Sequence, residues 1–103
     1  MEKIIIGWDV SSTTTAYSVL KIAKDAIYYI DSGYIKPIKN GTIFERLNYT
    51  KKEINKILTK YKPDEIAIEE IIQFMSGSSG AKTIIMLTSF NRMVGLTCYE
   101  YLN

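Results

Sequence analysis

The sequence predicts an α/β fold, in which a three-stranded antiparallel meander and a parallel fourth strand form a sheet with helices packed on it. Three observations support this. Three consecutive segments near the N-terminus are rich in β-branched and aromatic residues. A capped segment with apolar residues at helical spacing leads into a short apolar run, and a long apolar helical segment follows. At 103 residues, positions 1–103 are expected to form a single domain.

The three strands of the meander are expected at Lys3–Val10, Thr14–Ile22 and Ala26–Ile35. Lys24-Asp25 supplies a tight turn between the second and third strands. Ser11-Ser12-Thr13 is a polar turn directly after the first strand. The first strand reads as buried on both faces, because its residues are almost continuously apolar.

The first helix is expected from Thr42 to Tyr61. Thr42 and Glu45 have the spacing of a capping box, and Lys62-Pro63-Asp64 ends the helix. The apolar residues at helical spacing are Ile43, Phe44, Leu47, Ile54, Ile57, Leu58 and Tyr61. A short strand at Glu65–Glu69 completes a crossover unit, so this strand is expected to run parallel to the first.

A loop rich in glycine and serine, Gln73–Gly80, precedes a long helix at 81–102. This helix carries more apolar side chains than one stripe facing a sheet can hold. The surplus is therefore expected to be covered by a second subunit or by polypeptide beyond this chain.

Composition excludes several function classes. The chain has no histidine, which removes Ser-His and Cys-His nucleophile pairs and imidazole zinc sites. No apolar run is long enough to span a membrane, and the N-terminus leads straight into a strand, so a cytoplasmic protein is expected. The single cysteine, Cys98, is more typical of a buried structural thiol. The net charge of +2 does not by itself indicate nucleic-acid binding. A lysine cluster on the first helix favours a solvated face over a phosphate track; its members are Lys51, Lys52, Lys56, Lys60 and Lys62.

With these classes excluded, Asp9 and Glu69 are the candidates for a catalytic or metal-binding role. Each lies at the end of an apolar strand, and a charge buried there costs several kcal/mol unless it pairs, neutralises or binds a cation. Two carboxylates at the ends of adjacent strands indicate a divalent metal site. The alternative is that each accepts a hydrogen bond from a backbone N–H or pairs with a lysine. Glu70 competes with Glu69, but strand alternation directs it to the opposite face.

Two motifs resemble the RuvC family of Holliday junction resolvases in the ribonuclease H-like superfamily. They are Ile-Ile-Gly-Trp-Asp-Val-Ser-Ser-Thr-Thr-Thr-Ala-Tyr-Ser-Val at 5–19 and Pro-Asp-Glu-Ile-Ala-Ile-Glu at 63–69. The resemblance implies a metal-dependent endonuclease that uses Mg²⁺ or Mn²⁺ and acts on branched DNA such as a four-way junction. Asp9 and Glu69 align on two of the family's four catalytic acids.

The resemblance also implies contacts with DNA and with a second subunit. Phe74 is the candidate for stacking on an unpaired base, and phosphate contacts are expected from Lys82 and Arg92 and from Ser11 and Ser12 in the polar turn. The 81–102 helix is the homodimer interface in the family.

The family's other two acids lie on a helix that follows a fifth strand. We expect that final strand and helix to be missing here, since Glu100 is poorly placed to replace an acid. A chain truncated in this way is expected to be weakly active or inactive.

Two other functions remain open. Asp9-Val-Ser-Ser-Thr13 loosely resembles the first phosphate loop of sugar kinases and actin-like ATPases, so the chain could be an ATP-binding fragment. That loop usually has glycine where this chain has Ser11. The other alternative is a non-catalytic DNA-binding or scaffold domain of the same fold.

Overall fold

A computed structural model of the chain describes residues 2–11, 14–69 and 81–103. All the expected elements are present, in the expected order. They are β1 (Lys3–Val10), β2 (Thr15–Ala23), β3 (Ala26–Ile35), α1 (Ile43–Tyr61), β4 (Glu65–Ile68) and α2 (Ala81–Leu102).

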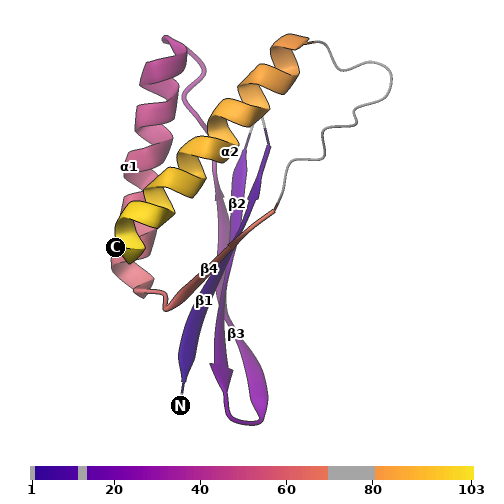
Figure 1. The fold of residues 1–103 in the computed structure, drawn as a ribbon, viewed down its shortest axis with the longest axis vertical. Coiled ribbons are helices and arrows are strands. Elements are labelled where there is room, and N and C mark those ends of the chain that lie inside the picture. Colours follow the sequence, from indigo (N-terminus) through magenta and orange to yellow (C-terminus); the bar gives the residue numbers. More distant parts are fainter. Residues whose placement is uncertain (1, 12–13, 70–80) are drawn as a thin grey trace.

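The four strands form one sheet in the order β3-β2-β1-β4, so β3 and β4 are its edges (Figure 1). β1 and β2 are antiparallel, as are β2 and β3, and β4 runs parallel to β1. This confirms the meander and the crossover through α1. The ladder between β2 and β3 contains a bulge: Val19 pairs with Asp31 and Leu20 with Tyr29, which leaves Ile30 without a partner.

The capping box of α1 is confirmed. The Thr42 hydroxyl accepts a hydrogen bond from the Glu45 backbone N–H at 3.1 Å, and the Glu45 carboxylate accepts one from the Thr42 N–H at 3.0 Å. At the other end, Lys62 adopts a left-handed conformation (φ 49°) and its N–H donates to the Leu58 carbonyl. These local contacts fix where the crossover helix begins and ends.

The core lies between one face of the sheet and both helices. Alternate residues of β1 point toward α1 and α2, and they are joined there by residues of β2 and β3. The buried cluster consists of Ile6, Trp8, Val19, Ile35, Ile54, Leu58, Val94 and Cys98. Neither described helix is long and apolar enough to cross a membrane.

The opposite face of the sheet is not covered by any described residue. Ile27, Tyr29 and Tyr34 of β3 remain 65–67% exposed. The expectation that β1 is buried on both faces is therefore wrong, and Asp9 is exposed. The physical reason is alternation: Ile6 and Trp8 point toward the helices, so Asp9 points away from them.

Candidate metal centre

Asp9 and Glu69 lie side by side on the uncovered face of the sheet. Asp9 is the penultimate residue of β1, and Glu69 directly follows β4. Trp8 pairs with Ile68 in the parallel ladder, and the Glu69 N–H donates to the Trp8 carbonyl at 3.1 Å. The ladder therefore brings the next residues, Asp9 and Glu69, to the same row.

A residue of α2 also holds Glu69. The side-chain amide of Asn91 donates a hydrogen bond to the Glu69 carbonyl at 3.1 Å. Asn91 is only 5% exposed, and its position is fixed by the packing of α2 on the core. The backbone of Glu69 is thus tied to a neighbouring strand and to a helix.

The two carboxyl groups interact with each other. A hydrogen bond with Asp9, reinforced by the repulsion between the two charges, raises the pKa of the Glu69 carboxyl. Both residues are exposed, and the ion pairs among the described residues do not include either of them. The pair therefore carries negative charge that no described cation compensates.

This donor set suits a hard divalent cation. Mg²⁺ and Mn²⁺ prefer carboxylate oxygens, and Mg²⁺ keeps several positions for water and phosphate. Within 2–11, 14–69 and 81–103, no group of three or more Asp, Glu, His or Cys side chains gathers around a common point. Asp9 and Glu69 accordingly fit as part of a metal site rather than as a closed cage.

A depression of about 450 Å³ extends from the carboxylates over the sheet. Its floor is made of small residues in register on three strands, because Gly7 pairs with both Ser18 and Ala67, and Asp9 pairs with Ala16. A Cβ atom added at Gly7 would meet nothing within 4 Å. The approach to Asp9 and Glu69 therefore crosses small side chains on β4, β1 and β2, and Tyr34 of β3, which pairs with Ala16, borders it.

Two of the residues predicted to contact DNA lie on α2. Lys82 is exposed in its first turn. Arg92 is exposed and, with Glu69 and Asn91, lines a cavity of about 250 Å³. Arg92 therefore lines the same cavity as Glu69, whereas Lys82 lines a different one.

Of the polar turn expected after β1, Ser11 lies in the described part of the chain. The Ser11 hydroxyl accepts a hydrogen bond from the Thr14 N–H and donates one to the Thr14 carbonyl, both at 2.9 Å. Ser12, Glu70 and Phe74 lie outside the described residues. Glu100 forms an ion pair with Lys51 at 3.6 Å.

Sequence reasoning missed Asn91 and the small residues on the floor of the depression. The sequence did contain a signal at Gly7, because glycine inside a central strand weakens that strand and often marks a site where a ligand or another backbone approaches closely. Asn91 was a polar residue in an apolar helical segment, but its partner lies 22 positions away.

The antiparallel meander and the parallel fourth strand after a crossover helix define a ribonuclease H-like fold. The model of one family, crossover junction endodeoxyribonuclease RuvC, matches residues 5–100. The chain belongs to the RuvC family.

Curated relatives named crossover junction endodeoxyribonuclease RuvC occur in several bacteria. The relative from Fusobacterium nucleatum is 29% identical over 100 residues, which cover 92% of this chain and 53% of the relative. The relative from Orientia tsutsugamushi strain Boryong is 32% identical over 81 residues, covering 79% of this chain and 51% of the relative. The chain spans about half the length of the curated relatives it matches.

Solved structures agree on the fold. The structure of Thermus thermophilus RuvC in complex with a Holliday junction substrate superposes with a TM-score of 0.76 at 16% identity, covering 96% of this chain and 59% of that one. A second T. thermophilus RuvC structure gives 0.72 over 95% of this chain and 58% of that one, also at 16% identity.

Proposed function

We propose that this chain is the part of a metal-dependent endonuclease for branched DNA that supplies Asp9 and Glu69 to the metal site. The observation that carries the proposal is the contact between these two carboxyl groups, which no described cation neutralises. Membership of the RuvC family and the Holliday junction in the T. thermophilus RuvC complex support a four-way junction as the substrate. We place the enzyme in the cytoplasm.

Asp9 and Glu69 would hold Mg²⁺ or Mn²⁺. When bound, such a cation activates water and neutralises charge on a phosphodiester. The protein's own contribution is geometric: the Trp8 carbonyl and Asn91 fix the Glu69 backbone, while the β1–β2 ladder fixes Asp9. The shallow floor around Gly7 leaves room for a DNA strand to approach.

Residues 1–103, as one unit, are expected to cut DNA weakly or not at all. Two carboxylates bind a divalent cation loosely, and a two-metal mechanism needs further ligands to hold both ions. The test is cleavage of a synthetic four-way junction in Mg²⁺ or Mn²⁺. Strong cleavage by this chain, abolished by Asp9→Asn, would show that the described acids suffice.

Metal binding tests the site without relying on cleavage. Mn²⁺ titration followed by NMR line broadening should affect the amides around Asp9 and Glu69, and Asp9→Asn should remove the effect. Asp25→Asn, in the turn between β2 and β3, is the matched control because it removes a carboxylate far from the site along β2. If wild type and Asp9→Asn respond alike, the metal site is wrong, and a non-catalytic DNA-binding domain of the same fold becomes the better description.

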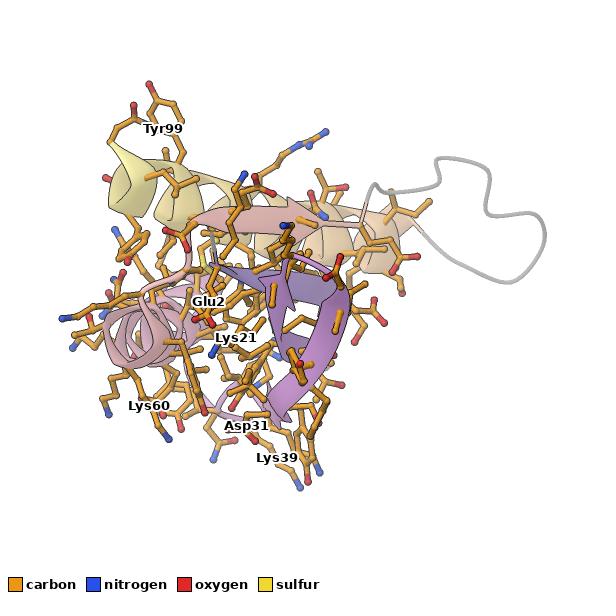
Figure 2. The ribbon with its side chains drawn as sticks, turned by 90° about the horizontal axis from the view of Figure 1, so that it is seen from below. Glu2, Lys21, Asp31, Lys39, Lys60 and Tyr99 are labelled. Atoms are coloured by element: carbon orange, nitrogen blue, oxygen red, sulfur yellow. The ribbon has the colours of Figure 1, made fainter. Side chains whose placement is uncertain are left out.

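We further propose that the protein is a homodimer through α2 and that its DNA contacts include Ser11, Ser12, Phe74, Lys82 and Arg92. Ile85, Leu96 and Tyr99 of α2 are 59–66% exposed. Figure 2 shows Tyr99 extending from the helix away from the sheet. These apolar side chains support a second copy as the partner.

Leu96→Glu should convert a dimer to a monomer in analytical ultracentrifugation. Ile27→Glu, on the uncovered face of β3, should leave the assembly unchanged. A wild-type chain that sediments as a monomer at high micromolar concentration would contradict the dimer.

A further inference from the structure

Arg46 is a half-buried cation with no carboxylate partner among the described residues. It lies in the first turns of α1, where its Nε donates to the Ile38 carbonyl at 3.0 Å. The guanidinium lies 5.8 Å from the centre of the Phe90 ring, and Nη1 is 3.9 Å from the Met86 sulfur. These contacts hold the guanidinium in place without neutralising its charge.

A second cation faces the same space. Lys82 and Thr83, from the start of α2, line a cavity of about 220 Å³ together with Arg46 and Met86. Lys82 has no ion-pair partner in the part of the chain that the structure describes, and the first turn of α2 has no acidic residue. Two helices distant in sequence thus bring two uncompensated cations and a hydroxyl to one concavity.

The cavity lies where the first turns of α1 and α2 meet. In Figure 1, α1 and α2 both begin at the upper end of the molecule, the end toward which β1 runs. Arg46 is half-buried, and a charge that is partly removed from water costs stability unless an anion compensates it. Guanidinium and ammonium groups around a small concavity are the usual partners of a phosphate oxygen.

We propose that Arg46, Lys82 and Thr83 form a phosphate-binding site that takes a backbone phosphate of the DNA substrate away from the bond that is cut. This inference rests on the proposed function for its source of phosphate. Arg46 supplies the oriented donors, Lys82 an adjustable charge, and the Thr83 hydroxyl a further hydrogen bond. The site would fix the register of a DNA arm without reading its sequence.

The alternative is that Arg46 only braces the segment containing Ile38 against α2. Such a brace would affect stability but not DNA binding. The variants must therefore separate loss of charge from loss of packing.

The first measurement is the salt dependence of binding to a synthetic four-way junction without divalent metal, by fluorescence anisotropy. Lys82→Gln should lower the slope of log K against log salt by about 1, as expected for one lost phosphate contact. Arg46→Gln should do the same, whereas Arg46→Lys, which keeps the charge, should retain most of the slope. Lys24→Gln is the control, since Lys24 lies in the hairpin turn between β2 and β3 at the far end of the sheet.

The second measurement is a titration with inorganic phosphate followed by NMR. Saturable shifts are expected at the Arg46 Nε–H and at the Lys82 and Thr83 amides, but not at Lys24. Arg46→Gln should abolish the shifts at Lys82 and Thr83.

The outcomes separate the two proposals. If wild type binds the junction but neither charge-removing variant changes the slope, the phosphate site is wrong and the proposed function stands. If Arg46→Gln lowers only the melting temperature and Lys82→Gln has no effect on binding, Arg46 is a brace. If phosphate shifts the site but wild type does not bind the junction, the site takes an anion other than DNA, and both the DNA role and the proposed function are overturned.

Discussion

Thr15→Val is expected to stabilise the chain. Thr15 begins β2, opposite Val10 of the strand that carries Asp9, and its side chain is fully buried. Its hydroxyl has no hydrogen-bond partner among the described residues. Leaving a buried donor unsatisfied costs about 1–3 kcal/mol, and valine replaces the hydroxyl with a methyl group of similar size in a residue that favours strands.

The expected gain is large enough for ordinary unfolding experiments. A change of 1 kcal/mol shifts the melting temperature of a domain of this size by about 4–8 °C, so Thr15→Val should raise it by at least about 4 °C. Urea unfolding should show a higher midpoint with an unchanged slope, because the surface exposed on unfolding stays the same.

Thr50→Val is the matched control. Thr50 is also fully buried, but its hydroxyl donates to the Arg46 carbonyl at 3.1 Å. Removing that bond should cost up to about 1.5 kcal/mol. If Thr15→Val is as destabilising as Thr50→Val, the Thr15 hydroxyl is hydrogen-bonded in solution and the reasoning fails.

Three further predictions concern titratable groups. Asp9 raises the pKa of the Glu69 carboxyl, so the pair stabilises the metal-free fold at low pH and loses that contribution as pH rises through the folded pKa. Asp9→Asn should therefore be more stable than wild type near pH 7 in EDTA. Identical pH profiles of the two proteins in urea unfolding would contradict this. Burial raises the pKa of the Cys98 thiol to about 11, so a thiol reagent at pH 8 should modify Cys98 only after unfolding. Rapid labelling of the native chain would show that the thiol is accessible. The Tyr61 hydroxyl donates a hydrogen bond to Asp31 and lowers the pKa of that carboxyl, so Tyr61→Phe should destabilise the fold above about pH 4. The difference in stability between Tyr61→Phe and wild type should vanish as acid protonates Asp31. A difference that persists below the folded pKa would assign the loss to packing.

Elements with local causes could be predicted from the sequence. The limits of α1 follow from the Thr42–Glu45 capping box at one end and from Lys62 and Pro63 at the other, all within a few positions of the helix. The parallel pairing of β4 with β1 follows from the length of the crossover. The proximity of Asp9 and Glu69 follows in turn, because parallel strands end at the same edge.

The environment of the carboxylates could not be predicted. The run Ile4-Ile5-Ile6 is apolar at every position, and nothing in it shows which face the helices cover. The structure covers Ile6 and leaves Asp9 exposed. The pKa of the exposed Glu69 carboxyl is therefore raised first by its hydrogen bond with Asp9, then by the repulsion between the two charges, and only last by desolvation.

Contacts between segments that are far apart in the sequence could not be predicted either. Arg46 reads as one more charge on an amphipathic helix, and its neighbour Met86 lies 40 positions away. Its role depends on how α1 and α2 cross, which spacing along one helix does not encode.

The bulge at Ile30 affects how the protein behaves at high concentration. An edge strand with unpaired backbone groups and exposed apolar side chains is a template for adding further strands, and β3 presents Ile27 and Tyr29 beside such an edge. The extra residue interrupts the regular spacing of donors and acceptors along β3, so an incoming flat strand cannot match the whole edge. The opposite edge, β4, has only four residues and offers a short template. The sheet itself thus limits aggregation through its edges, because neither β3 nor β4 offers an incoming strand a long, regular template.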